Sequence, residues 1–161
     1  MTILSQRGAT VTELEAQDIA EFHELRVLLE GAVTELAVPR ITDSDIESMR
    51  GLAEAMEEAT RQARVQDWVD LNQQFHMVLY GASGKRHFLR LIDRTFTRTR
   101  PYISLYLGLG GNLAVLNADH GGILEMASRR DIVGTRQLVE QNIRRSGAGL
   151  SSFLERLHGD H

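Results

Sequence analysis

Residues 68–79 read WVDLNQQFHMVL, and this stretch decides the class of fold. Its large apolar side chains recur at the period of an α-helix with one buried face: Trp68, Val69, Phe75 and Leu79. Asn72 and His76 fall within the same stripe, one helical turn apart, so both are expected to point inward. A buried polar group without a hydrogen-bond partner costs about 1–3 kcal/mol, so each of these two side chains needs a partner.

Two further helical stripes each contain one polar residue. The stripe around His120 consists of Leu113, Leu116, Ile123, Leu124 and Ala127. The stripe around Asn142 consists of Ile132, Thr135, Val139 and Ile143. A single inward histidine or asparagine is more often satisfied by a backbone carbonyl or a buried water than by a metal ion. Four such residues from three segments weaken that interpretation and predict a polar site in the core.

The same helical period continues through the rest of the chain, and nothing after residue 12 alternates as a strand does. The expected helices span about 18–38, 42–63, 66–81, 87–107, 113–129 and 131–157, with Thr42 or Ser44 as the cap of the second. Short connections between six helices predict an all-α fold, a six-helix antiparallel bundle.

Composition narrows the class of protein. The chain has 161 residues, no cysteine and a net charge of −4, which excludes disulfides and thiolate metal sites and argues against general affinity for nucleic acid. The longest apolar stretch, residues 102–109, is far below the roughly 20 residues of a membrane span. The N-terminus lacks the pattern of a secretion signal. These features predict one domain in the cytoplasm.

The four inward residues have a defined chemistry. Asn72 and His76 are four residues apart and therefore share one helix face, and His120 and Asn142 would close the site from neighbouring helices. Imidazole nitrogens suit zinc, nickel or copper, whereas amide oxygens are weak neutral ligands that suit harder ions. The set is polar but carries little charge.

The spacing of these polar residues resembles that of a known family. His76 and His120 are 44 residues apart, and His120 and Asn142 are 22 apart. The chain also contains, in this order, Arg26-Val-Leu-Leu-Glu30, the segment 71–76, the turn through Gly84, Asp119-His120 and Asp131. With these features it resembles the effector-binding C-terminal (FCD) domain of GntR-type bacterial transcription regulators of the FadR subfamily. The resemblance covers about residues 18–157, with residues 158–161 as a tail.

The resemblance implies a ligand-binding and dimerising module that often holds a divalent metal through one aspartate and three histidines, beside a small carboxylate effector. His76 and His120 match two of the histidines. Asn72 stands in place of the aspartate and Asn142 in place of the third histidine, which should weaken a transition-metal site. One zinc or nickel ion, weakly held, and a metal-free polar pocket are the two alternatives.

Effector contacts are expected on the fourth helix. Arg94, Arg98 and Tyr102 recur every four residues, so an arginine there is a candidate to bind a carboxylate. The alternative is a solvated basic edge. Arg26 and Glu30 lie on an apolar stripe and are interpreted as an inward ion pair that ties helices together.

The resemblance also implies an N-terminal winged helix-turn-helix, for which residues 1–17 are too short. This segment is interpreted as a linker and the remnant of a wing, with residues 6–11 as the last wing strand, in a truncated regulator or a free-standing effector domain. Two other functions compete with the sensor: a metal-assisted enzyme, and a structural dimerisation bundle without ligand. No inward carboxylate pair or nucleophile motif supports the enzyme, so a non-enzymatic sensor and homodimer is the prediction.

Overall fold

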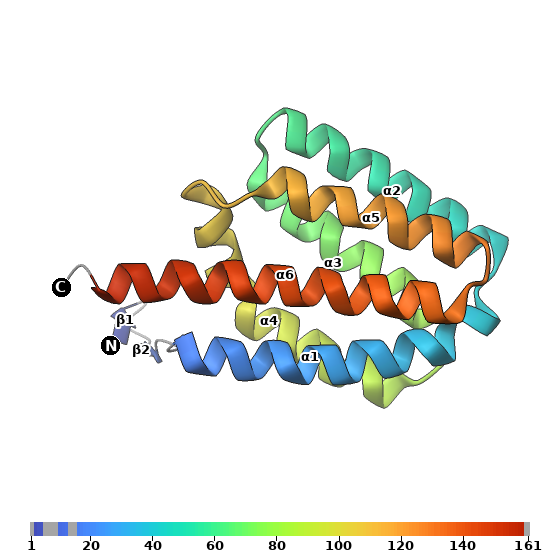
Figure 1. The fold of residues 1–161 in the computed structure, drawn as a ribbon, viewed down its shortest axis with the longest axis horizontal. Helices are drawn as coiled ribbons and strands as arrows, with labels where there is room; N and C mark the ends of the chain where they lie inside the picture. The colour runs from blue at the N-terminus through green and yellow to red at the C-terminus, as the bar shows by residue number, and fades with distance from the viewer. Residues whose placement is uncertain (1, 5–9, 13–15, 160–161) are drawn as a thin grey trace.

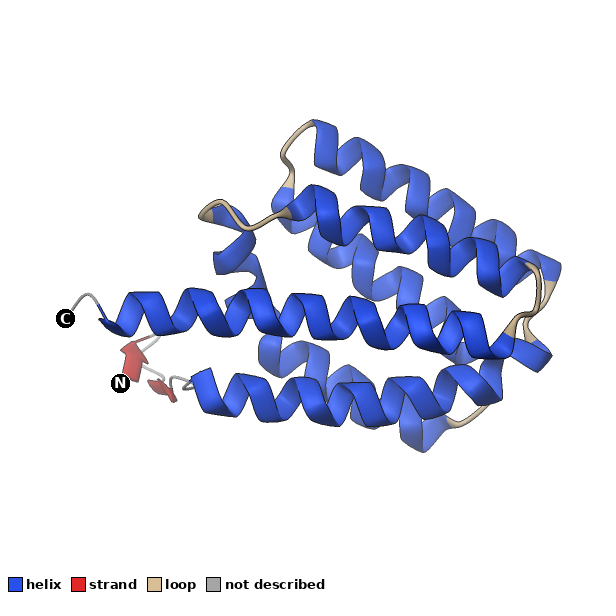
Figure 2. Ribbon diagram, in the orientation of Figure 1, coloured by secondary structure: helices blue, strands red, loops and turns tan. Residues whose placement is uncertain are grey.

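The computed structural model describes residues 2–4, 10–12 and 16–159, and this part of the chain contains six α-helices (Figures 1 and 2). They are α1 (Ala16–Ala37), α2 (Asp43–Arg61), α3 (Val65–Gly81), α4 (Arg86–Gly108), α5 (Leu113–Ser128) and α6 (Ile132–Gly159), with a short 3-10 turn η1 (Val38–Arg40) after α1. The predicted all-α, six-helix fold is confirmed, and the helix boundaries agree with the expected ones to within about two residues.

Local sequence explains where individual helices begin and turn. Thr42 caps α2: its hydroxyl accepts the Asp45 N–H, and the Asp45 carboxylate accepts the Thr42 N–H, so two backbone donors at the helix start are satisfied. Gly84 adopts a φ of 66° in the turn between α3 and α4, a conformation that costs glycine little. The cap is therefore Thr42 rather than Ser44.

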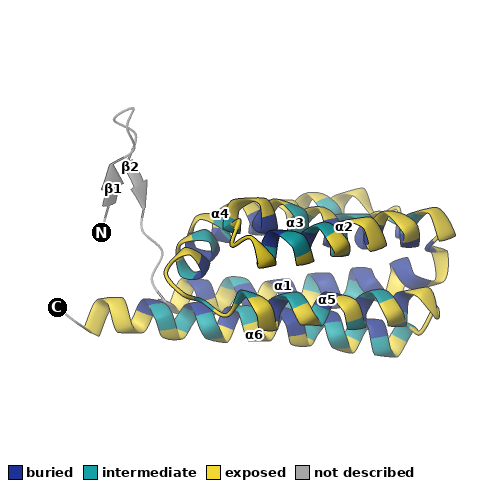
Figure 3. Ribbon diagram, turned by 90° about the horizontal axis from the view of Figure 1, so that it is seen from above, coloured by how far each residue is buried: buried dark blue, intermediate teal, exposed yellow. Residues whose placement is uncertain are grey.

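The helices form a closed ring in two layers. Contacts run from α1 to α6, α5, α2, α3 and α4 and back to α1. Seen from above, α1, α5 and α6 form one layer and α2, α3 and α4 the other (Figure 3). Helices α1 and α6 lie side by side in opposite directions (Figure 1). Side chains between the layers are thus enclosed by helices on all sides.

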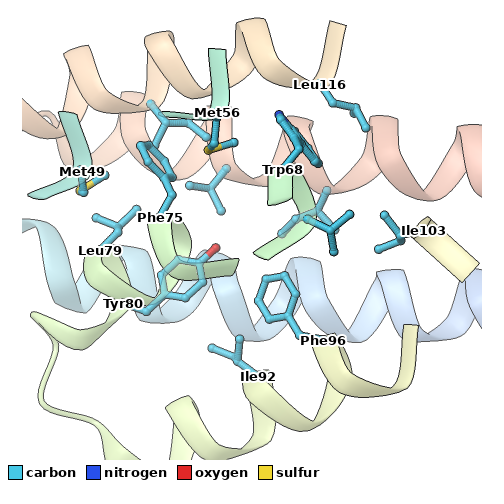
Figure 4. Packing of buried hydrophobic residues seen from close by; sticks show 14 of the residues in the cluster. Met49, Met56, Trp68, Phe75, Leu79, Tyr80, Ile92, Phe96, Ile103 and Leu116 are labelled. Carbon is cyan, nitrogen blue, oxygen red and sulfur yellow. The ribbon is translucent and has the colours of Figure 1, made fainter. Parts of the chain in front are cut away.

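Helix α3 supplies the centre of the core. Trp68, Phe75, Leu79 and Tyr80 from this helix are almost completely buried, as are Met49 and Met56 from α2 and Ile92 and Phe96 from α4 (Figure 4). These side chains surround the space into which α3 also projects its polar residues. The fold therefore places the predicted polar site inside an apolar shell.

Two short strands precede the bundle. β1 (Thr2–Leu4) pairs with β2 (Thr10–Thr12) in an antiparallel register that sets Ile3 opposite Val11. Of the predicted wing strand, residues 10 and 11 lie in β2, and residues 6–9 lie outside the described residues. Among the described residues, no helix has the length and apolar content needed to cross a membrane.

Candidate functional site

The four inward polar residues meet between α3, α5 and α6. His76 and His120 are 0% and 1% exposed, and their Nε2 atoms are 3.2 Å apart. The Asn72 side-chain oxygen lies 2.7 Å from the Nε2 of His120, and the Asn142 side chain lies beside His76. Two imidazoles and two amides therefore share one enclosed space, as the stripes predicted.

The His120 ring is held by the backbone of its own helix. Its Nδ1 lies 2.9 Å from the carbonyl oxygen of Leu116. A carbonyl oxygen only accepts, so the proton of the neutral ring is on Nδ1. The Nε2 of His120 consequently presents a lone pair to the shared space.

The His76 ring is held by a chain of groups that ends on α1. Its Nδ1 lies 3.2 Å from the Tyr80 hydroxyl, which donates its own proton to Glu30 at 2.7 Å. Glu30 also accepts from Arg26 Nε at 2.7 Å, which confirms the inward Arg26–Glu30 pair. With its one proton directed at Glu30, the Tyr80 oxygen accepts from His76. The Nε2 of His76 therefore also presents a lone pair.

The Asn142 amide is oriented from behind by an acidic residue on α5. Its Nδ2 donates to Asp119 at 3.2 Å, and Arg145 donates to the same carboxylate. A carboxylate accepts hydrogen bonds only, so the amide nitrogen faces Asp119 and the amide oxygen faces His76. Asp119 thus stabilises Asn142 as a further acceptor.

Burial keeps both imidazoles neutral. Desolvation lowers the pKa of His120 from 6.5 to about 4, partly opposed by its bonds to backbone carbonyls and by Asp119. Desolvation, then the neighbouring His120 and Arg26, lower the pKa of His76 well below 6.5. Neutral imidazole is the form that ligates a metal ion.

The arrangement places acceptors against one another; the Asn72 amide also carries two N–H donors, which face His120 only when the amide is rotated. The lone pairs of two Nε2 atoms and the oxygens of two amides face one another, and acceptors at 2.7–3.2 Å repel unless a cation, a proton or a donor lies between them. Two nitrogens about 2.1 Å from a shared zinc ion lie roughly 3.0–3.4 Å apart, so the spacing of the histidines fits one. Histidine and asparagine side chains supply all of these atoms, so the donor set is neutral. Among the described residues, no three histidine, aspartate or glutamate side chains gather as metal ligands.

A small cavity adjoins these residues. Its volume is about 20 Å³, room for about one water molecule. The polar lining comes from Arg26, Asn72, Asn142 and Ser146, and apolar side chains of α3 to α6 complete it. A carboxylate with several heavy atoms fits only after the surrounding helices separate.

The arginines of the fourth helix lie elsewhere. Arg94 and Arg98 are exposed, whereas Tyr102 is buried, and none of the three lines the cavity. Arg26 lines the cavity instead. The sequence had indicated for Arg26 an ion pair with Glu30. Its Nε and Nη2 donate to Glu30, and its guanidinium lies 4.4 Å from the centre of the Phe96 ring. Its position within an apolar stripe was the available signal.

Comparison with known proteins gives a consistent result. The FCD domain family matches residues 21–145. The HTH-type transcriptional regulator McbR of Escherichia coli (strain K12) is 23% identical over 150 residues, which cover 89% of this chain and 67% of McbR. The Nta operon transcriptional regulator of Aminobacter aminovorans is 27% identical over 100 residues, or 62% of this chain and 47% of the regulator.

Solved structures agree on the fold. The structure of Escherichia coli McbR/YncC has a TM-score of 0.82 at 22% identity and covers 92% of this chain and 76% of its own. A GntR family member from Pseudomonas syringae pv. tomato has a TM-score of 0.75 at 21% identity, with coverage of 96% and 65%. The curated relatives are regulators by name, in agreement with the expectation of a non-enzymatic domain. The FCD match covers most of this chain, which therefore belongs to the FCD domain family.

Proposed function

We propose that this chain is the effector-sensing part of a GntR-type transcriptional regulator of the FadR subfamily, and that it binds a small carboxylate beside a divalent metal ion in the bundle core. The observation that carries the proposal is the convergence of two Nε2 lone pairs and two amide oxygens next to a cavity lined by Arg26. A cation satisfies the acceptors, and an anion satisfies Arg26.

In this proposal His76 and His120 bind the metal, zinc or nickel, and Asn72 and Asn142 complete the protein ligands. A bound ion supplies Lewis acidity with which to hold a carboxylate. The protein ligands are neutral, so the effector carboxylate is the group that balances the charge of the ion. Each should therefore raise the affinity of the other by the same factor, as linkage requires.

Arg26 is the group that connects the site to the rest of the molecule. Its guanidinium has donors beyond the two that bond Glu30, and a planar fork suits a carboxylate. Because the cavity holds about one water, binding selects a state in which α1, α3 and α6 are further apart. Arg26 lies ten residues after the start of α1, roughly 15 Å along that helix. A shift of α1 would reach a DNA-binding domain joined before it, and such a regulator works in the cytoplasm.

We also propose that the domain forms a homodimer through α1. Leu25, Leu28 and Leu36 are exposed on one side of this helix, with Leu28 exposed to 67%. A groove between α1 and α6 runs beside Leu28. Large apolar side chains gathered on one helix favour a protein contact.

The metal ligands can be tested by elemental mass spectrometry after incubation with zinc or nickel and desalting. We expect about one ion per chain, with more retained when a carboxylate effector is present. His76→Ala and His120→Ala should lose the ion, because each removes an imidazole ligand. His87→Ala, at an exposed histidine on α4, should keep it. Equal metal content in wild type and His76→Ala would contradict the assignment.

Stability of the chelated protein should depend on pH through His120. The pKa of His120 is about 4 in the folded chain and 6.5 in the unfolded chain. Between these values the His120 ring binds a proton in the unfolded chain and stays neutral in the folded chain. The free energy of unfolding is therefore highest above pH 6.5 and falls by up to about 3 kcal/mol as the pH drops to 4. Urea titrations of His120→Leu should show a weaker fall between pH 7 and 4.5 than His87→Leu does. Identical pH profiles for the two variants would rule out His120 as the source.

Effector binding can be tested by thermal shift with hydroxy-, keto- and dicarboxylic acids. An effector at 100 times its Kd adds about 2.7 kcal/mol to the free energy of unfolding and raises Tm. Arg26→Lys should abolish that rise because it loses the fork but keeps the charge beside Glu30. Arg98→Lys, at the exposed position, should keep it. A flat response of folded wild-type protein to the whole panel would count against sensing, and loss in Arg98→Lys alone would assign the contact to α4.

The dimer can be tested by sedimentation equilibrium. Wild type is expected as a dimer at micromolar concentration, and Leu28→Glu as a folded monomer, because the variant places a charge in the apolar contact. Leu91→Glu changes a leucine exposed to 48% on α4 and should remain dimeric. A monomeric wild type, or a dimeric Leu28→Glu, would refute the role of α1.

A further inference from the structure

Tyr80 lies between His76 and Glu30, in the core of the bundle. It follows His76 by one turn on α3, and Glu30 reaches it from α1. All three residues are fully buried, and the Tyr80 oxygen lies 2.7 Å from the Glu30 carboxylate and 3.2 Å from the Nδ1 of His76. The contact to Glu30 joins residues 50 positions apart in the chain, so it depends on the packing of α1 against α3.

The direction of each hydrogen bond in this chain is determined. Arg26 pairs with Glu30 at 2.7 Å, so the carboxylate is charged and only accepts. The Tyr80 hydroxyl has one proton and donates it to Glu30, since the carboxylate can only accept. The remaining lone pairs of the Tyr80 oxygen can only accept, and the group that faces them is the Nδ1 of His76.

This polarity has two consequences for His76. The proton of the neutral ring is on Nδ1, which leaves the Nε2 lone pair directed at His120 and Asn142. The chain through Tyr80 to Glu30 also fixes the orientation of the ring, and a hydrogen-bonded partner behind a histidine ligand raises its affinity for a metal. The charge of Glu30 is paired with Arg26, so the two add no net charge behind the ring. His120 lacks such a side-chain partner, since its Nδ1 bonds the backbone carbonyl of Leu116.

We propose that Tyr80 and Glu30 are positioning residues for His76: Tyr80 holds the ring in the tautomer with the proton on Nδ1, and Glu30, by accepting the Tyr80 proton, fixes the direction of that hydrogen bond. The metal part rests on the proposed function, whereas the tautomer does not.

The test combines two measurements on the 161-residue chain. Long-range 15N–1H correlation spectra of the chelated, 15N-labelled protein at pH 7.5 report which ring nitrogen of each histidine carries the proton. Competition with a fluorescent chelator gives the zinc affinity. The variants are Tyr80→Phe, which removes the hydroxyl, and Glu30→Gln, whose single side-chain oxygen accepts from Arg26 so that its NH2 group faces the Tyr80 hydroxyl. Tyr106→Phe is the matched control, since Tyr106 packs against Phe153 away from the site.

In wild type we expect the His76 proton on Nδ1. Tyr80→Phe should move it wholly or partly to Nε2 and weaken zinc binding at least tenfold. Glu30→Gln should also move the proton toward Nε2 and weaken zinc binding, because the Gln NH2 group donates to Tyr80 and the Tyr80 hydroxyl then donates to the Nδ1 of His76. His120 should keep its proton on Nδ1 in every variant, and Tyr106→Phe should match wild type in both measurements.

A wild-type His76 with its proton on Nε2 would overturn the tautomer assignment, and this result needs no variant to fold. Unchanged spectra and affinity in Tyr80→Phe would overturn the role of Tyr80. Unchanged spectra in Glu30→Gln would overturn the role of Glu30. A wild type that binds no zinc while His76 carries its proton on Nδ1 would remove the metal but keep the tautomer, so the two failures are distinguishable.

Discussion

The buried ion pair between Arg26 and Glu30 is the interaction on which the polar core depends. Two charges inside a bundle are tolerated only when their hydrogen-bonding groups are satisfied, and removal of one partner typically costs about 3–5 kcal/mol. Here Glu30 accepts from Arg26 and from Tyr80, and the guanidinium also lies over Phe96. The pair thereby joins α1 to α3 and α4, and through Tyr80 it sets the orientation of His76. A change at Arg26 is felt at the histidines without a direct contact between them.

The chemistry of the site follows from a shortage of donors. His76 and His120 are each held at Nδ1 by an acceptor, Asn142 is turned by Asp119, and Asn72 lies against His120. Acceptors that face one another in an apolar core are unfavourable on their own, and a cation between them relieves the repulsion. The neutral ligands then leave part of the charge unbalanced, which is the reason to expect metal and carboxylate to bind together. A sensor built this way responds to an anion only where a cation is present.

Sequence periodicity predicted much of this fold because each helix buries one stripe. Asn72, His76, His120 and Asn142 were found as polar interruptions of such stripes, and the structure brings them together. The row of Arg94, Arg98 and Tyr102 does not stay on one face of its helix. A step of four residues advances 40° around a helix, so a row of three turns by about 80°. Its last member is buried while the first two are exposed. The Tyr80–Glu30 contact and the cavity beside Arg26 arise from packing between distant segments, which periodicity does not encode.

Anomalous diffraction at the zinc absorption edge would locate the metal ion in crystals of the domain equilibrated with zinc and a carboxylate that raises its Tm. We predict one strong anomalous peak between α3, α5 and α6, about 2.0–2.1 Å from the Nε2 atoms of both His76 and His120. Density for the carboxylate should adjoin the peak and Arg26. Anomalous peaks confined to surface histidines, with the two Nε2 atoms bridged by water or by each other, would contradict this prediction.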